Sequence, residues 1–435
     1  MPDCRLARDC RSLGYCLLRQ FVFAGLALVL VAVPIGSASA RSKATSGGVG
    51  VLTGSPHKRK QPAAPARRAQ VNPFAVRGMW IWVVADSSGG SLSAIISRAH
   101  QYGIGTVIIK SGDGTGTWSQ FSAPLVSRLH AAGLRVCGWQ FVYGNNPLGE
   151  AQVGAATVNA GADCLVIDAE SDYEGKYIQA QTYIAQLRKL IGANFPLALA
   201  GFPYIDFHPA FPYSIFLGPG GAQYNTPQMY WRDIGTTVDA VYSHTYAYNR
   251  LYQRRIYPLG QIYNAPPPGQ VIRFRQVARA YGAPNVSWWD WQEGTQAAWS
   301  AIARSARSLS GYVASPLVAT INSSSAGDLV VWAQEHLISA GYPITVDGGY
   351  GASTVAAVEN FQAAHGLTVD GVIGPMTWSA LLRYAPANVR WTTAGAKLAA
   401  AARFSLTMPV PRSARLHAKR DELAGPSGAG MPPRR

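Results

Sequence analysis

Eight short apolar runs recur between residues 72 and 312, each bounded by Gly, Asp or Asn, and they constrain the fold most strongly. Several are almost continuous in Val, Ile and Leu, which is typical of parallel strands buried on both faces. Helical stretches lie between the first runs, at 92–102, 123–132, 150–160 and 177–190. The apolar runs are 79–85, 106–110, 135–143, 164–169, 197–202, 228–231, 257–263 and 286–291.

Eight strand–helix repeats over this length predict an α/β fold, a (β/α)8 TIM-like barrel, at residues 73–312. The later repeats, at 203–257, are irregular and rich in Tyr, Phe and Pro, so a doubly wound sheet stays open as the alternative. A chain of 435 residues is long enough for more than one hydrophobic core, and a second folded unit is therefore expected.

A doubled turn motif marks that second unit. The pattern DGxxGxxT begins at Asp347 and returns 23 residues later at Asp370. Its glycines permit the positive φ of a tight turn. Thr354 and Thr377 stand where helix N-caps are expected, ahead of helices at 355–362 and 378–382. With a helix at 329–337, the pattern predicts a small all-α domain of three helices.

Together with Phe361-Gln362 and Gly366-Leu367, the doubled motif resembles the widespread bacterial peptidoglycan-binding domain of the three-helix type. The resemblance covers nearly all of 326–384. It implies binding to a wall polymer, with no chemistry in the domain itself. The alternative is a helical bundle that serves only as a packing or protein-contact unit.

The first forty residues have the features of a secretory signal peptide. A basic segment with four Arg precedes an apolar run at 21–35 and a small-residue cleavage site at 37–40. The run is short for about 30 Å of hydrocarbon, which disfavours the alternative of a membrane anchor. We expect cleavage after Ala40, a secreted and cell-wall-associated protein, and no stable membrane insertion after cleavage.

The formal charge of +16 is concentrated towards the ends of the chain. Residues 1–40 carry +2, residues 41–72 carry +7 and residues 385–435 carry +7, which leaves 73–384 neutral. A nucleic-acid-binding domain carries its basic patch on the folded surface, so no nucleic-acid partner is expected. The basic segments suit either loose attraction to an anionic envelope or simple solubility.

The expected organisation has six parts: a signal peptide at 1–40, a basic disordered linker at 41–72, the barrel at 73–312, a linker at 313–325, the peptidoglycan-binding domain at 326–384 and a basic disordered tail at 385–435. Only Cys137 and Cys164 remain after cleavage, each near the start of an apolar run. They form either a disulfide in an oxidising compartment or two buried thiols.

Two carboxylates end the fourth apolar run. Asp168 and Glu170 are two residues apart, so an extended strand turns both to one face, and at the end of a barrel strand that face is the mouth. Carboxylates held side by side disfavour double ionisation, so one can keep its proton near neutrality. Glycosidic cleavage uses such a pair: one acid protonates the leaving oxygen and a second carboxylate stabilises or orients.

This DxE ending resembles that of the β/α-barrel lysozymes and, more distantly, of the chitinase clan. The resemblance implies that Glu170 is the general acid and that Asp168 orients a substrate acetamido group, which acts as the nucleophile. The chain departs from these families at two places. Val166 replaces the middle acid of the chitinase motif, and the first strand has no Asp directly after Gly78, the nearest acid being Asp86.

A broader resemblance is to the glycoside-hydrolase-like barrels of actinobacterial exported proteins, which are often joined to wall-binding modules. It rests on the Gly78 start, the DxE ending and the Trp-Trp-Asp-Trp-Gln segment at 288–292. That group is named by its fold, and activity does not follow from a fold alone.

Further polar and aromatic residues lie at or just after predicted strand ends and are candidate sugar contacts. Aromatic faces and planar polar groups suit sugar binding, although Trp and Tyr also fill barrel interiors. The alternative for the carboxylate pair is a purely structural role, as an inward-facing ion pair with Lys110. The candidates are Asp86, Lys110, Asp113, Gln140, Tyr143, Tyr204, Asp206, Tyr230, Asp233, Gln261, Tyr263, Trp289, Asp290 and Gln292.

Other chemistries find no motif: neither HExxH nor a His/Cys cluster suggests a metal, and neither a GxSxG elbow nor a phosphate-binding glycine loop is present, so no cofactor is expected. Two hypotheses follow. The first is an exported glycosidase acting on peptidoglycan or a related wall glycan. The second is a non-catalytic wall protein whose barrel binds glycan or a partner. The oligomeric state is not predicted.

Overall fold

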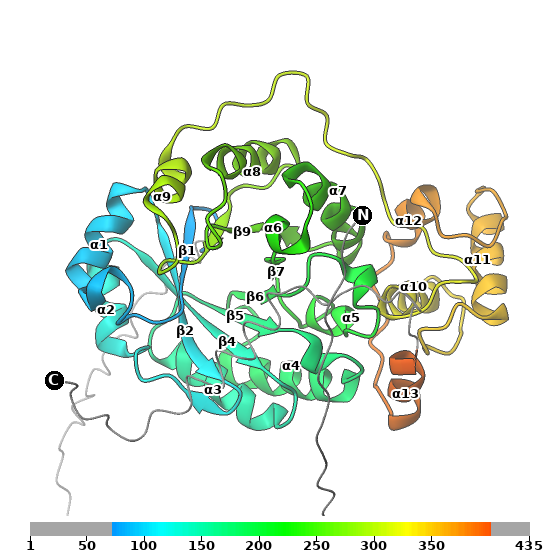
Figure 1. Cartoon of the computed structure of the whole chain (residues 1–435). Helices are drawn as coiled ribbons and strands as arrows, with labels where there is room; N and C mark the ends of the chain where they lie inside the picture. Colours follow the sequence, from blue (N-terminus) through cyan, green and yellow to red (C-terminus); the bar gives the residue numbers. More distant parts are fainter. Residues whose placement is uncertain (1–71, 402–435) are drawn as a thin grey trace, which may run out of the picture. The chain divides into compact units, whose positions relative to one another are not determined.

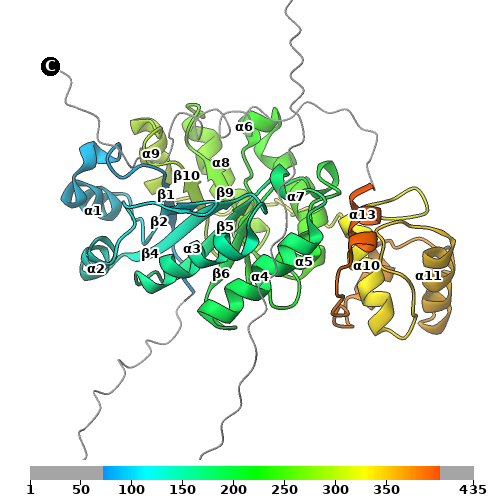
Figure 2. The same ribbon diagram turned by 90° about the horizontal axis from the view of Figure 1, so that it is seen from below.

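A computed structural model describes residues 72–401, so the predicted signal peptide, almost all of the first basic linker and the end of the tail lie outside the described residues. Figure 1 shows the strands of the first domain at its centre with helices around them, and Figure 2 shows the same layers from below. The strands are β1 Gly78–Ile81, β2 Thr106–Asp113, β3 Gly116–Thr117, β4 Arg135–Val142, β5 Cys164–Ala169, β6 Leu197–Ala200, β7 Tyr224–Asn225, β8 Arg255–Ile256, β9 Leu259–Gln261 and β10 Ser287–Trp289.

The helices of the barrel follow these strands in alternation. They are α1 Leu92–Gln101, α2 Ala123–Ala131, α3 Pro147–Asn159, α4 Tyr177–Ile191, α5 Tyr213–Phe216, α6 Trp231–Ile234, α7 Val238–Asn249, α8 Pro268–Ala280 and α9 Gln296–Ala303. None of the helices described within 72–401 is both long and apolar enough to cross a bilayer.

The strands form a closed ring. The sheet order is β8-β7-β6-β5-β4-β2-β1-β10-β9, with parallel pairing throughout except for the short β3 hairpin on β2. Its two ends, β8 and β9, are halves of one run separated only by Tyr257-Pro258, so β7 and β10 flank the same run. Because the first strand also pairs with the last, the barrel prediction is confirmed and the doubly wound alternative is wrong.

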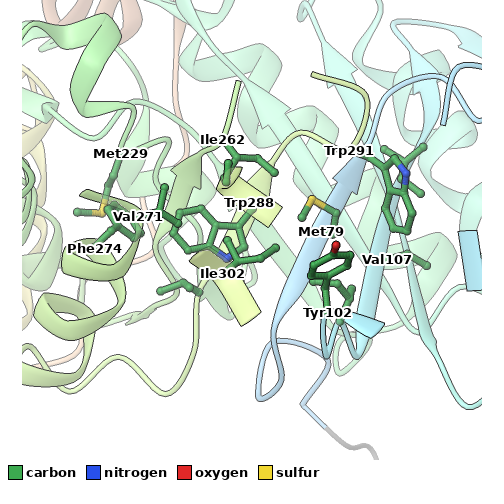
Figure 3. Close-up of a cluster of buried hydrophobic side chains, with 14 of the residues drawn as sticks. Met79, Tyr102, Val107, Met229, Ile262, Val271, Phe274, Trp288, Trp291 and Ile302 are labelled. Carbon is green, nitrogen blue, oxygen red and sulfur yellow. The ribbon is translucent and has the colours of Figure 1, made fainter. Parts of the chain in front are cut away.

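Alternation along the strands separates two apolar layers. Trp80, Trp139 and Trp289 belong to the cluster inside the ring. The neighbouring positions face the helices, as Figure 3 shows for Trp288, which packs among Val271, Phe274 and Ile302. Burial of both strand faces explains why the runs are continuously apolar instead of alternating.

Several predicted strands differ from those observed: β1 ends at Ile81 and not at residue 85, and the run at 257–263 contains only β9. The run at 228–231 is not a strand: β7 lies earlier, and only Gln228 bridges to Leu259. Pro227 has no N–H for the ladder, which explains the interruption. The second strand is longer than predicted and reaches Asp113, so Lys110 lies within it. The irregularity predicted for 203–257 is present as short helices and turns up to Ile234, whereas α7 at Val238–Asn249 is a regular helix of 12 residues.

Cys137 and Cys164 form a disulfide inside the ring. They are directly paired residues of the neighbouring strands β4 and β5, with Cα atoms 4.6 Å apart. Both side chains are fully buried in the inner apolar cluster. Of the two interpretations of these cysteines, the structure therefore has the disulfide.

We expect the double substitution Cys137→Ala, Cys164→Ala to lower the free energy of unfolding by about 3 kcal/mol, because the bond closes a loop across 27 residues of the unfolded chain. Urea unfolding of oxidised protein and of the variant measures the difference. Reduction of the wild type in the same experiment should lower its midpoint in the same direction. An unchanged midpoint after verified reduction would contradict the expectation.

The C-terminal domain contains α10 Asp328–Ser339, α11 Ala352–Ala364 and α12 Pro375–Leu381, the three helices that the sequence predicts. Gln334 of α10 organises the first DGxxGxxT turn. Its Oε1 accepts from the N–H groups of Asp347 and Gly348, both at 3.0 Å. Its Nε2 donates to Asp347 Oδ1 at 2.9 Å, Gly349 O at 3.0 Å and Thr354 Oγ1 at 3.1 Å.

Gln362 of α11 makes the corresponding contacts around the second turn, including one to Thr377 Oγ1 at 3.1 Å. The prediction that Thr354 and Thr377 are N-caps is wrong, because Gly351 and Gly374 occupy those positions. The threonine hydroxyls instead connect each glutamine to its turn. The two DGxxGxxT motifs are thus held by the same set of hydrogen bonds, each centred on one glutamine.

Helix α10 is joined to the barrel through a buried carboxylate. Asp328 is fully buried, and its oxygens accept from Ser214 N–H at 2.8 Å, Ser214 Oγ at 2.7 Å and Tyr252 Oη at 2.7 Å. Nearby, Trp332 Nε1 donates to Leu251 O at 2.9 Å. Side chains of the barrel and the C-terminal domain form one apolar cluster around these contacts, so the two domains are packed together.

The expectation of disorder from residue 385 onward is wrong for its first part. Helix α13 spans Thr393–Ala401, and the ring of Trp391 packs on Tyr177 of α4 with centroids 4.2 Å apart. The linker expected at 313–325 also makes contacts, since Ala319 and Ile321 are buried. A large aromatic ring and a few small apolar residues suffice to dock these segments, despite their Ala- and Pro-rich composition.

Candidate functional site

The predicted carboxylates share one hydrogen-bond donor at the carboxyl end of β5. Gln228 Nε2 donates to Asp168 Oδ1 at 3.0 Å and to Glu170 Oε1 at 2.9 Å. Asp168 continues the inward series Cys164 and Val166, and Glu170 follows directly after the strand. One amide thus holds both acids on the inward side. Each residue is largely buried, with 6% and 5% of its surface exposed.

Two tyrosines extend the site from the next part of the ring. Tyr230 and Tyr263 meet edge to face with centroids 5.5 Å apart. Burial raises the pKa of Tyr230 well above its ordinary value, and its acidic neighbours Tyr263, Asp168 and Glu170 act in the same direction. The Tyr263 hydroxyl donates to Asp233. The pKa of Tyr263 is raised mainly by burial and secondly by the negative charge of Asp233. Both phenols are therefore neutral donors near the acid pair.

A buried cation lies among aromatic rings on the adjoining strands. The ammonium of Lys110 is 2.6 Å from Asp113 Oδ2. It lies 4.5 Å from the ring centroid of Trp118, 4.9 Å from that of Trp139 and 5.7 Å from that of Trp82. Such an arrangement stabilises the positive charge through the electron-rich ring faces. Tyr143 Oη donates to the same Asp113 at 2.8 Å, which fixes the carboxylate.

Amide side chains hold the backbone on either side of this group. Gln120 Nε2 donates to Trp82 O at 2.7 Å and to Lys110 O at 3.0 Å. Gln292 Oε1 accepts from Trp82 N–H at 3.3 Å, which joins the first and last strands of the ring. Trp289 packs its ring 5.4 Å from that of Trp139. Asp290 is buried and accepts from the N–H of Glu293 at 3.1 Å.

Gln261 adds a buried amide near the end of β9. Its Oε1 accepts from Arg232 N–H at 2.8 Å. Its Nε2 has no hydrogen-bond partner within residues 72–401, although the residue is fully buried. An unsatisfied buried donor costs about 1–3 kcal/mol, so this amide is a ready donor for a ligand oxygen.

Within residues 72–401, Gln140, Tyr204, Asp206 and Asp86 make no contact with the acid pair. Gln140 is a wrong prediction: Trp139 and Phe141 face inward, so Gln140 faces the helices and donates to Gly114 O and Glu150 O. The others are Tyr204, whose ring stacks on His244, Asp206, which accepts from His244, and Asp86, which is exposed and has no ion-pair or hydrogen-bond partner within 72–401.

Gln228, Trp118 and Gln120 were not predicted as site residues. Gln228 had a usable signal, because it stands two residues before Tyr230 in the predicted run at 228–231, and a strand there would have turned both residues to one face. Trp118 and Gln120 lie after the β3 hairpin, where the sequence shows no apolar run. Within the described residues no cluster of His, Cys, Asp or Glu could hold a metal ion.

Chemically, the arrangement combines two carboxylates that share a neutral donor, two phenol donors and a caged ammonium. Two oxygens that accept from one amide nitrogen are at most about 6 Å apart. That is closer than the roughly 6.5–9.5 Å between the carboxyl groups of inverting glycosidases. The geometry suits one acid as a proton donor and the other as an orienting group.

Comparison with known sequences identifies the C-terminal domain. Residues 326–381 match the family model of the peptidoglycan binding domain. The zinc D-Ala-D-Ala carboxypeptidase of Streptomyces albus G is 40% identical over 65 residues, which are 14% of this chain and 25% of that protein. An uncharacterized protein of Kitasatospora aureofaciens is 53% identical over 36 residues, 8% of this chain and 30% of that protein. The chain thus spans less than a third of either relative.

Solved structures similar to the chain include barrels. A family 39 glycoside hydrolase of Bacteroides cellulosilyticus matches 56% of this chain and 66% of its own, with 12% identity and a TM-score of 0.40. A chitinase of Chromobacterium violaceum matches 52% of this chain and 98% of its own, with 11% identity and a TM-score of 0.36. The fold assignment therefore rests on the strand order of the chain itself. The protein joins a parallel β/α barrel to a peptidoglycan-binding domain at residues 326–381.

Proposed function

We propose that this protein is an exported, wall-associated glycoside hydrolase that cleaves peptidoglycan or a related glycan. The observation that carries the proposal is the Gln228 amide, which holds Asp168 and Glu170 together at the inward end of a barrel strand. The peptidoglycan-binding domain supports a wall glycan as the partner. The apolar run and cleavage site at 21–40 support export.

In the proposed reaction Glu170 donates its proton to the glycosidic oxygen as that bond breaks. The carbonyl oxygen of the substrate's acetamido group attacks the anomeric carbon, and Asp168 orients the acetamido N–H. Water then attacks the anomeric carbon, Glu170 accepts its proton and the acetamido group is released. Gln228 keeps the two carboxylates in register throughout, and Tyr230 supplies a neutral donor beside them.

Substrate contacts are proposed along both sides of the acid pair. The rings of Trp118 and Trp82 around Lys110 supply apolar faces for sugar rings. Gln261 Nε2 suits a sugar hydroxyl. The remaining predicted contacts, Asp113, Tyr143, Asp233, Tyr263, Trp289, Asp290 and Gln292, hold these groups in place.

Gln228→Ala is expected to lower kcat about 100-fold with little change in KM, because the acids lose the donor that aligns them while other sugar contacts remain. Release of reducing ends from purified sacculi, measured over a range of substrate concentrations, separates kcat from KM. Gln152→Ala is the matched control, since Gln152 is exposed on α3. A Gln228→Ala variant with unchanged kcat would remove this role.

A second candidate function is a non-catalytic wall protein whose barrel binds glycan or a partner. The small exposed fraction of both carboxylates favours it, since a cleaving acid must reach a bulky polymer. The first experiment is therefore the incubation of residues 41–435 with purified sacculi. Sedimentation with the wall without release of reducing ends would leave the binding function and end the hydrolase proposal.

A further inference from the structure

An open pocket of about 450 Å³ lies at the opposite end of the barrel from the acid pair. Three arginines line it, Arg250, Arg254 and Arg255, together with the rings of Tyr246 and Tyr281. Arg255 begins β8, whereas Glu170 follows the end of β5. Because all strands of the ring run parallel, strand starts and strand ends lie on opposite faces, and the two sites are separate.

The arginines keep most of their donors available. Arg250 donates to Tyr246 O at 2.6 Å and to Ser315 O at 3.2 Å. Arg254 donates to Leu217 O at 2.5 Å and to Gly218 O at 2.7 Å. A guanidinium has five N–H groups, so each retains about three. Arg255 is exposed and makes no side-chain hydrogen bond or ion pair within residues 72–401.

The charge of the pocket is not balanced by its own walls. None of the residues that line it is acidic. Helices α7 and α8 end beside it, at Asn249 and Ala280, and each C-terminus contributes about half a negative charge. Three guanidinium groups therefore leave an excess of about two positive charges. Burial lowers the pKa of Arg254, as expected for a cation without a carboxylate partner.

A purely structural role explains only part of the cluster. Arg250 caps the end of α7 through the Tyr246 carbonyl, and Arg254 holds the loop at Leu217 and Gly218. Arg255 has no such task. Its position on the rim, beside two partly occupied guanidinium groups, is that of a third donor for a shared anion.

We propose that this pocket binds a phosphate group carried on a polyol or sugar. Phosphate matches the excess of two charges, and its oxygens accept bidentate bonds from guanidinium forks. The volume exceeds that of a phosphate alone and leaves room for the attached group. Ser315 in the wall links the site to the segment between the two domains. The source is either a phosphodiester-linked wall polymer or a free sugar or polyol phosphate.

The test is calorimetric titration of residues 41–435 with glycerol 3-phosphate at constant ionic strength, with glycerol as the neutral control. We expect saturable binding of glycerol 3-phosphate only. Arg255→Gln should weaken that binding at least tenfold, and Arg250→Gln should do so as well. Arg128→Gln, an exposed arginine on α2, should bind as the wild type does.

Absence of saturable binding by the wild type overturns the proposal, as does an Arg255→Gln variant that binds like the wild type. Arg255 carries the decision, because its loss breaks no bond in the fold. Sacculi with and without their phosphodiester-linked polymers then separate the two sources. The site is assigned to the polymer if removal of the polymers lowers the wall retention of the wild type, and if Arg255→Gln shows an equal loss of retention on intact sacculi. Unchanged retention with intact binding of glycerol 3-phosphate assigns it to the soluble compound.

Discussion

Glu170→Gln should lower the release of reducing ends from sacculi about 10³-fold, because the amide cannot donate a proton to the leaving oxygen. Its shape and its contact with Gln228 remain close to those of the acid. Sedimentation with the wall should be unchanged, since the peptidoglycan-binding domain at 326–381 is untouched. The measurement is a reducing-end assay with equal amounts of wall-bound protein.

Asp172→Asn is the matched control, because Asp172 is an exposed acid in the same loop, two residues further on. It should retain wild-type activity. Equal activity of Glu170→Gln and the wild type would exclude Glu170 as the acid. Equal inactivity of all three proteins, with intact wall binding, would favour the non-catalytic function instead.

Asp328→Ala should lower the free energy of unfolding by about 3–5 kcal/mol at pH 4. The substitution leaves the Ser214 N–H, the Ser214 hydroxyl and the Tyr252 hydroxyl buried without their acceptor. These groups lie where α10 packs on the barrel, so the loss should loosen the contact between the two domains. Urea unfolding followed by tryptophan fluorescence measures it, because Trp332 lies at this contact.

The effect should depend on pH with a defined sign. Burial raises the pKa of Asp328 to about 7 from its usual 3.8, against the opposing effect of its hydrogen-bond donors. The folded state therefore holds the proton more tightly than the unfolded state. Its stabilising contribution is complete below about pH 3.8 and is lost as the pH rises to about 7. The advantage of the wild type over Asp328→Ala should narrow across that window.

Other groups near Asp328 make the difference measurement necessary. Glu335 is also buried, and its pKa is raised first by burial and then by the charge of Asp328, so it contributes with the same sign. Comparison of wild type with Asp328→Ala at each pH largely removes that background. Glu359→Ala, at an exposed acid on α11, should show neither the loss nor the narrowing. A difference that is constant from pH 4 to 8 would refute the linkage.

The barrel could be predicted because its signal is local. Runs such as 164–169 coincide with the observed strand β5, since burial on both faces demands continuous apolar residues. The prediction failed at 228–231, because Pro227 interrupts the hydrogen-bond ladder before this run. The run lies outside any strand, and its last residue, Trp231, begins α6. The prediction also failed at Trp391, whose contact with Tyr177 joins segments far apart in the chain.

The site shows the same division between local and distant information. The spacing of Asp168 and Glu170 placed both acids on one face, but spacing could not reveal that Gln228, 58 residues beyond Glu170, would hold them. Gln140 was predicted on the wrong face of β4, because Trp139 and Phe141 are the inward residues of that strand. The period-two rule says that neighbours alternate, but it does not say which set faces inward. The phase of a strand is set by which neighbours it packs against, and a single run does not contain that information.

The packing of α10 on the barrel changes how attachment to a wall would work. A module on a flexible linker lets its partner domain sweep a volume set by linker length. Here the contacts of Asp328 and Trp332 hold the two domains against each other. If the peptidoglycan-binding domain holds a wall polymer, its contact with the barrel sets the distance and the direction of the barrel from that polymer. The mouth of the barrel would then meet only glycan strands at that distance. A protein built in this way would act at one distance from its point of attachment, and not anywhere within the reach of a flexible linker.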